Sequence, residues 1–188
     1  MKTSGSADNS FARSETGAGV SRRMVVFIGL GVWLLAIPLA HGVVPRVISL
    51  FWARHGWEAG QPNVWNLLGL VPAALGITGL AWVMVTGFAS VSRLPDRVKL
   101  GLAPILLLTS GPFAWSRNPM YVSALTLWVG WSLFYGSVAV AAVCTVFWAL
   151  VAFIIVPREE RSLEACFGET YLRYKQQVPR WLGKRRKS

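Results

Sequence analysis

The chain has 188 residues, of which 54% are hydrophobic and only 14% are charged, and its mean hydropathy is +0.47. Soluble domains carry about 25% charged residues, so this composition excludes an ordinary soluble domain and indicates a membrane protein. The formal net charge of +11 does not indicate a nucleic-acid partner, because the basic residues lie between and after the apolar segments, where membrane topology accounts for them. Two cysteines and two histidines give little support to a disulfide framework or a metal site.

The N-terminal part of the chain predicts a disordered tail followed by a first membrane span. Residues 1–21 are polar and rich in Ser and Gly, and we expect residues 22–188 to form a single membrane domain. Residues 24–44 are apolar and reach the roughly 20 residues that cross a bilayer. A signal peptide is the alternative, but the segment is long for one and no small-residue cleavage site closes it. We therefore expect a retained span, followed over residues 45–63 by an interfacial loop with room for a short surface helix.

The middle of the chain predicts a second span and a shorter apolar segment. Residues 64–89 form the second span, and they carry Gly69, Gly76, Gly79 and Gly87. Small residues let membrane helices approach closely, so we interpret these glycines as packing positions rather than a cofactor loop. Residues 100–108 are apolar but too short to cross, which favours a re-entrant or interfacial segment.

Two further apolar segments predict a helical hairpin. The third span covers residues 119–135 and the fourth covers residues 137–156, with Gly136 suited to end one helix and Ser137 suited to cap the next. So short a connection makes the two helices antiparallel neighbours. Residues 157–188 form the tail, and their apolar side chains recur at helical spacing, which predicts an amphipathic helix bent at Gly168. The expected fold is all-α: a polytopic membrane bundle of about four transmembrane helices with a C-terminal amphipathic helix.

The distribution of basic residues predicts the orientation of the bundle. With the N-terminus in the cytoplasm, only Arg46 and Arg54 of the 19 Lys and Arg residues lie outside. The positive-inside rule therefore predicts a multi-pass protein with cytoplasmic N- and C-termini, and a bacterial inner membrane and an endoplasmic reticulum fit equally. This topology places Arg117 and Glu159 on the same face.

The stretch Thr109–Tyr121, TSGPFAWSRNPMY, predicts a polar site at the start of the third span. Asn118 is a good N-cap, and Pro119 suits the first helical position, where a missing N–H costs nothing. The helix N-terminus carries partial positive charge, and Arg117 adds a full charge beside it. With the Phe113 ring nearby, the set suits a small ligand with a carboxylate and a planar ring. The alternative is a capped helix with ordinary interfacial aromatics.

The sequence Arg158-Glu159-Glu160 places two acids directly after an apolar span. Acids near hydrocarbon are costly unless they are paired or hydrated. An acid here can bind ribose hydroxyls or a cationic centre. The alternative is a solvated start to the tail helix, where Glu complements the helix dipole.

Taken together, these motifs resemble a known group of integral membrane proteins, the isoprenylcysteine carboxyl methyltransferases and phospholipid methyltransferases. The family pattern is a T-x-G-P-Y turn, R-H/N-P-x-Y, a helical hairpin, E-E, and F-G-x-x-Y-x-x-Y before V-P. The chain follows this order through PREERSLEACFGETYLRYKQQVPRWL, and the resemblance covers residues 106–182. It departs at Asn118, where many members have His, and at Phe113, where many have Tyr.

The resemblance implies an S-adenosylmethionine-dependent methyltransferase acting at the cytoplasmic face. The acceptor is expected to be lipid-like or small and apolar, to carry a carboxylate, amine or thiol, and to enter from the lipid bilayer. The residues implied for cofactor binding are Leu107, Leu108, Gly111, Phe113, Arg117, Asn118, Pro119, Tyr121 and Glu159. Glu160 is implied as a second acid or a catalytic base, and our hypothesis for Arg158 is that it orients an anionic acceptor. Because Asn118 cannot titrate, an acceptor that needs no base is favoured slightly.

Two other classes of function stay open at this stage. A membrane reductase using NADPH is one, because related helical folds include sterol and steroid reductases, although adjacent Glu159 and Glu160 suit a nicotinamide phosphate poorly. A non-enzymatic membrane protein is the other. No charged residue lies within the four spans, which argues against a translocation path for polar solutes. Nothing in the sequence indicates an oligomeric state.

Overall fold

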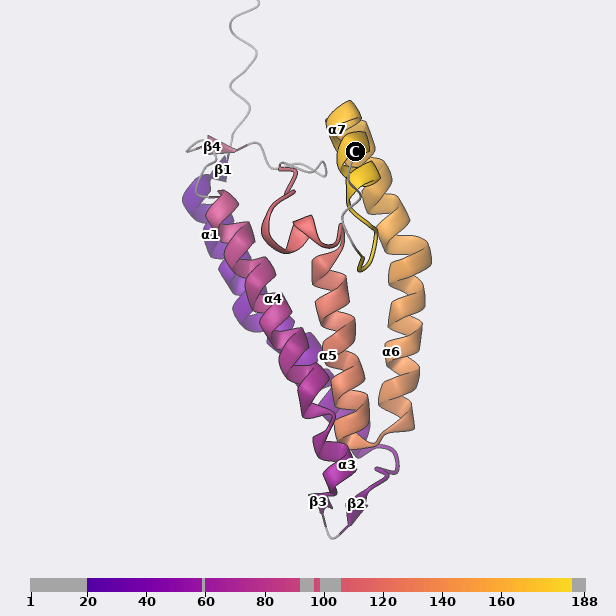
Figure 1. The fold of residues 1–188 in the computed structure, drawn as a ribbon. Helices are drawn as coiled ribbons and strands as arrows, with labels where there is room; N and C mark the ends of the chain where they lie inside the picture. Colours follow the sequence, from indigo (N-terminus) through magenta and orange to yellow (C-terminus); the bar gives the residue numbers. More distant parts are fainter. Residues whose placement is uncertain (1–19, 59, 92–96, 99–105, 184–188) are drawn as a thin grey trace, which may run out of the picture.

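The computed structural model describes residues 20–58, 60–91, 97–98 and 106–183, and it is a bundle of long helices (Figure 1). The strands within the described residues are two short antiparallel pairs. Val20–Ser21 (β1) pairs with Arg97–Val98 (β4), and Trp57–Glu58 (β2) pairs with Gln61–Pro62 (β3). The expected all-α fold is confirmed. Residues 1–19 of the predicted tail and residues 100–105 of the predicted re-entrant segment lie outside the described residues.

The first crossing is one continuous helix, Arg23–Leu50, that joins α1 (Arg22–Gly31), π-helical turns at Val32–Ala36 and Leu39–Val43, and α2 (Val44–Leu50). The predicted start of a loop at Pro45 is therefore wrong. Proline cannot donate to the carbonyl four residues earlier, which usually breaks a helix. Here Trp131 Nε1 donates to that carbonyl, on His41, at 2.6 Å. The helix thus continues because a neighbouring helix supplies the missing donor.

The second crossing consists of α3 (Val64–Leu67) and α4 (Leu70–Val91), and it packs closely on α5. A Cβ added at Gly76 would lie 2.6 Å from the Leu127 backbone, and one at Gly79 would lie 2.3 Å from Ser123 Oγ. The predicted packing role is confirmed there, whereas a Cβ at Gly87 meets nothing within 4 Å. Figure 1 shows why: α4 and α5 converge at the end that carries β2 and β3 and diverge toward the other end.

The third and fourth crossings form the predicted hairpin of α5 (Pro119–Tyr135) and α6 (Val138–Leu150). Gly136 ends α5 in the left-handed conformation with φ 55°, and the Ser137 hydroxyl accepts a hydrogen bond from the Val140 N–H. Both turn predictions are confirmed. The buried core lies along the two contacts of α5, with Leu127 facing α4 and Trp128 facing α6.

The chain continues from α6 through a π-helical turn at Val151–Ile155 into α7 (Val156–Gln177). Gly168 interrupts α7 with φ 48° and ψ −128°, so the predicted bend is confirmed. Beyond the bend, Tyr171, Tyr174 and Val178 cluster with apolar side chains that include Leu107 and Leu163. The apolar stripe of the tail helix is therefore covered in part by the chain itself.

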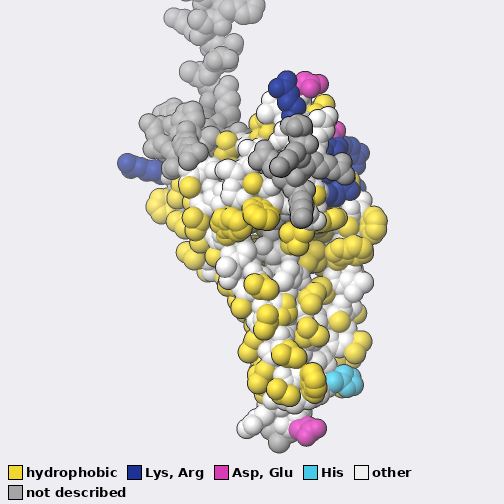
Figure 2. Space-filling model, viewed as in Figure 1, with side chains coloured by type: hydrophobic (Ala, Val, Ile, Leu, Met, Phe, Trp, Pro, Cys, Tyr) yellow, Lys and Arg dark blue, Asp and Glu magenta, His cyan; other side chains and the backbone are white. Residues whose placement is uncertain are grey.

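Three helices, Arg23–Leu50, Val64–Val91 and Val138–Gln177, are long and apolar enough to cross a membrane. The α5 helix has 17 residues, a length of about 25 Å, and no charged side chain, so it completes a bundle of about four crossings. Figure 2 shows hydrophobic side chains along the bundle and Lys and Arg side chains gathered at the end that carries α7. The chain is an integral membrane protein, and β1 and the C-terminal part of the described chain lie at one end (Figure 1).

Candidate functional site

A cavity of about 240 Å³ lies at that end of the bundle, where the segment before α5 meets α7. It is lined by Leu106, Leu107 and Leu108, by Phe113, Arg117 and Asn118, and by Glu159, Leu163, Tyr171 and Tyr174 of α7. The two stretches that the sequence singles out therefore meet in space. Of the residues proposed for the cofactor, Gly111, Pro119 and Tyr121 lie next to the lining rather than in it.

The loop that forms one wall of the cavity is held between α4 and α7. Gly111 has φ 61° and opens a short 3₁₀ turn, η4 (Gly111–Ala114), and a Cβ there would lie 2.9 Å from Thr86 Oγ1 of α4. The hydroxyl of Tyr174 donates to the carbonyl of Phe113 at 2.7 Å. Burial raises the pKa of Tyr174, which keeps this phenol a donor. Gly111 thus shapes the wall that carries Phe113.

The start of α5 differs from its prediction in one respect. The helix begins at Pro119 as expected, but the Asn118 side chain makes no capping hydrogen bond. Its Nδ2 instead donates to the carbonyl of Arg180 at 3.0 Å, and its backbone N–H donates to Ser116 Oγ at 3.0 Å. The predicted cap is wrong because a segment 62 residues further along the chain engages the amide.

Tyr121 links the first turn of α5 to the acidic pair. Its hydroxyl donates to Glu159 Oε2 at 3.1 Å, and Glu159 is the carboxylate that lines the cavity. The topological expectation that Arg117 and Glu159 share a face is confirmed, because both line the same cavity. This bond joins the first turn of α5 to α7 beside the cavity.

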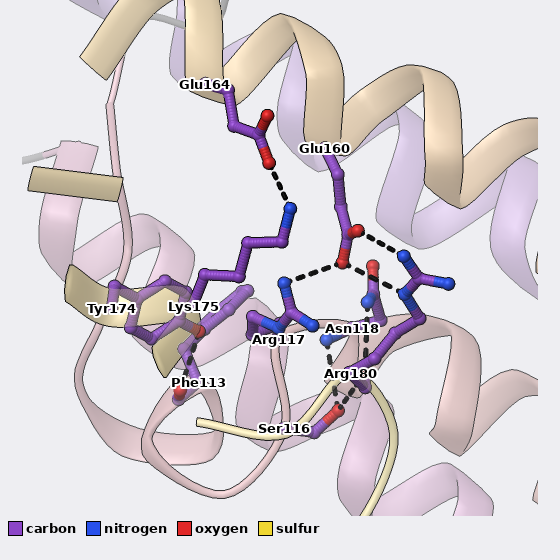
Figure 3. A network of polar contacts seen from close by, with 9 residues as sticks. All are labelled: Phe113, Ser116, Arg117, Asn118, Glu160, Glu164, Tyr174, Lys175 and Arg180. Atoms are coloured by element: carbon purple, nitrogen blue, oxygen red, sulfur yellow. Dashed lines mark hydrogen bonds and ion pairs between the residues drawn. The ribbon is translucent and has the colours of Figure 1, made fainter. Parts of the chain in front are cut away.

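The neighbouring acid, Glu160, lies in an ion network instead (Figure 3). Successive residues of an α-helix point about 100° apart, so Glu159 and Glu160 face different surroundings. Glu160 is only 4% exposed. It forms an ion pair with Arg117 Nη1 at 3.0 Å, and it accepts hydrogen bonds from Arg180 Nε at 3.2 Å and from Arg180 Nη2 at 2.6 Å. Glu160 is outside the cavity lining, and Arg158 is exposed and also outside it.

Three buried polar atoms beside the cavity lack a well-oriented hydrogen-bond partner among the described residues: Arg117 Nε, Arg117 Nη1 and the Tyr171 hydroxyl. Arg117 Nη1 has its ion pair with Glu160, and the Tyr171 phenol lies against the Arg117 side chain. The Arg117 side chain is only 9% exposed. Leaving such donors unsatisfied costs free energy, so their position beside a cavity is typical of a ligand site. With Glu159 on α7, the cavity offers a cation, an anion and apolar walls. This set fits a zwitterionic ligand that carries a planar ring.

A second cavity, about 260 Å³ and mainly apolar, lies between α1 and α4. Trp33 and Phe88 are among its walls, and it shares Leu106 and Leu108 with the first cavity. The shared leucines separate a polar site from an apolar groove in the membrane-spanning part of the bundle. The polar and the apolar cavity are therefore neighbours at this end of the bundle.

Sequence reasoning did not include several of these residues in the site. Tyr171 and Tyr174 appear in the sequence as part of an apolar stripe, and the Y-x-x-Y spacing of the family pattern was the signal that could have placed them in the cavity. Leu106 and Leu163 gave no signal beyond hydrophobicity. Arg180 gave none, because its partner Glu160 is 20 residues away and belongs to another segment.

Comparisons with known proteins agree with the resemblance. The model of the phospholipid methyltransferase family matches residues 73–170. The human Protein-S-isoprenylcysteine O-methyltransferase is 39% identical over 77 residues, which are 39% of this chain and 26% of the human protein. Its counterpart in Xenopus laevis is 36% identical over 118 residues, which are 61% of this chain and 39% of that protein.

A bacterial relative matches over a longer range. The cobalt-zinc-cadmium resistance protein CzcN of Cupriavidus metallidurans is 27% identical over 166 residues, which are 86% of this chain and 68% of that protein. The matches to the vertebrate relatives span about a quarter to two-fifths of their length. The family match runs from α4 into α7 and so includes the loop, the hairpin and the acidic pair. The chain belongs to the phospholipid methyltransferase family of integral membrane proteins.

Proposed function

We propose that this protein is an S-adenosylmethionine-dependent methyltransferase that acts on a lipid-like or small apolar acceptor at the cytoplasmic face of its membrane. The observation that carries the proposal is the cavity that Arg117 and Glu159 both line. Such a pair suits a ligand with both a carboxylate and a cationic group. Family membership supports methyl transfer, and the vertebrate relatives are named for it.

Different residues of the cavity would bind different parts of the cofactor. Arg117 would hold the carboxylate, and Glu159, oriented by Tyr121, would hold the ammonium group or the ribose hydroxyls. Phe113 and Leu107 supply apolar surface for a planar ring. S-adenosylmethionine supplies, when bound, a methyl group made electrophilic by its sulfonium. The residues of the chain then align the acceptor with it and keep water away.

The apolar groove indicates how the acceptor reaches the site. It meets the polar cavity at Leu106 and Leu108, and its other walls belong to the continuous helix Arg23–Leu50 and to α4, two of the helices long and apolar enough to cross the membrane. Glu160 is engaged by two arginines, which leaves it poorly placed to act as a base. An acceptor that arrives as a carboxylate or a thiolate needs no base, so we favour these over an amine. Exposed Arg158 is free to attract such an anion to the surface.

The orientation follows from charge. The site lies at the end of the bundle that carries β1 and α7, where Figure 2 shows basic side chains. The positive-inside rule then predicts that this end faces the cytoplasm. A cytoplasmic site is also the one that water-soluble S-adenosylmethionine can reach.

Cofactor binding by the full-length protein in detergent or nanodiscs tests the proposal. We expect saturable binding of S-adenosylhomocysteine, and we expect Glu159→Ala to abolish it. Glu58→Ala is the matched control, because Glu58 is exposed in β2 at the opposite end of the bundle. Incubation of membranes with methyl-labelled cofactor, followed by lipid analysis, then identifies the acceptor. Binding of NADPH without binding of S-adenosylhomocysteine would refute the proposal in favour of a reductase.

A further inference from the structure

The segment Val178–Leu182, here called the C-terminal strap, is fixed to the start of α5 through its backbone. The N–H of Arg117 donates to the Pro179 carbonyl at 2.9 Å. The carbonyl of Arg180 accepts from Ser116 Oγ at 3.3 Å and from Asn118 Nδ2 at 3.0 Å. Three successive residues before α5 thus bind two successive carbonyls of the strap, as Figure 3 shows for Ser116 and Asn118.

The side chain of Arg180 adds a charged link to the same place. Its guanidinium binds both carboxylate oxygens of Glu160, and Arg117 pairs with the Oε1 atom of the same carboxylate. The hydrogen bonds to Glu160 raise the pKa of Arg180, so its guanidinium stays protonated. A buried carboxylate is tolerated only when its charge and lone pairs are satisfied. The Glu160 carboxylate therefore depends on both Arg117 and Arg180, and loss of one arginine should disturb the other two side chains.

The contacts with Glu160 and with the strap occupy some of the polar atoms of Arg117 and Asn118, both of which line the cavity. Glu160 holds Nη1 of Arg117 in an ion pair, and the Arg117 side chain also lines the cavity. Asn118 uses one N–H of its side-chain amide on the strap, which leaves its oxygen and the second N–H for the cavity that it lines. The strap and Glu160 therefore restrict the orientations that the Arg117 and Asn118 side chains can adopt beside a ligand.

We propose that Arg180 is a positioning residue of the methyltransferase site and that the C-terminal strap orients Arg117 and Asn118 toward the cofactor. The inference rests on the proposed function for the identity of the ligand. Arg180 does not line the cavity, so it acts through its partners. The two adjacent acids then have different roles: Glu159 lines the ligand cavity, and Glu160 binds Arg180 of the strap.

The test compares Arg180→Ala with Arg180→Lys in the full-length protein, with Arg173→Ala, an exposed position on α7, as the control. We expect Arg180→Ala to weaken binding of S-adenosylhomocysteine at least tenfold and Arg173→Ala to leave it unchanged. Arg180→Lys should restore part of the loss, because Lys keeps the charge but not the two-pronged contact. Hydrogen exchange at the backbone amide of Arg117 should become faster in Arg180→Ala, because its acceptor is on the strap.

The outcomes separate this inference from the proposed function. If the unaltered protein binds S-adenosylhomocysteine and Arg180→Ala binds it equally well, the positioning role is refuted while the function stands. If the unaltered protein does not bind S-adenosylhomocysteine, the proposed function is refuted. Hydrogen exchange then tests the strap by itself: an unchanged exchange rate at the Arg117 amide in Arg180→Ala refutes the positioning role of Arg180. Should Arg180→Ala not fold, Ser116→Ala removes one contact to the strap and should still weaken binding several-fold.

Discussion

Replacing Glu160 by glutamine is expected to destabilise the protein far more than the same change at Glu159. Glu160 is 4% exposed and holds two arginines, one of them with a side chain only 9% exposed. Removing one partner of a buried ion pair costs about 3–5 kcal/mol. Because the Arg180 side chain is 40% exposed and partly solvated, we expect the lower end of that range, about 3 kcal/mol.

Reversible denaturant unfolding in mixed micelles, followed by tryptophan fluorescence, measures this difference. Glu159 is exposed and accepts a hydrogen bond from the Tyr121 hydroxyl, so Glu159→Gln should change the free energy of unfolding by less than about 1 kcal/mol. The same variant should lose cofactor binding. Equal free energies of unfolding for the two glutamine variants would refute the assignment of Glu160 to a structural network and of Glu159 to the ligand.

Three further predictions concern other parts of the site and its frame. Tyr121→Phe removes a hydrogen bond to a carboxylate and should weaken cofactor binding about fivefold in a titration, with folding unchanged. Gly76→Leu should prevent folding, seen as aggregation on size-exclusion chromatography, because even a Cβ lies 2.6 Å from the next helix, whereas Gly87→Ala should fold normally. Tyr174 has a raised pKa in the folded state, so its contribution to stability is present below about pH 10 and is lost as pH rises through the folded pKa. Tyr174→Phe should lessen the alkaline loss of stability in a pH series of unfolding curves, and an equal loss would contradict this.

The sequence alone predicted a structural feature wherever all the interacting residues lie within one short segment. The turn at Gly136 and Ser137 is an example, because a left-handed glycine and a serine cap need only neighbours within four residues. The start of α5 at Pro119 and the bend at Gly168 are others. Hydropathy, summed over about 20 residues, likewise sufficed to predict an all-α membrane bundle of about four crossings. The order of motifs along the chain was enough to indicate the family that the comparisons then showed.

The tertiary structure decided what depends on partners distant in sequence. Asn118 has the residue type of a helix cap, yet its amide binds Arg180, 62 positions away. The first helix passes through Pro45 because Trp131, on another helix, donates to the carbonyl of His41. Glu159 and Glu160 look equivalent in sequence, and only the packing of α7 turns one toward the cavity and buries the other between two arginines. A periodic pattern records which face of a segment is apolar, but the partner of a polar atom is set by where separate segments meet.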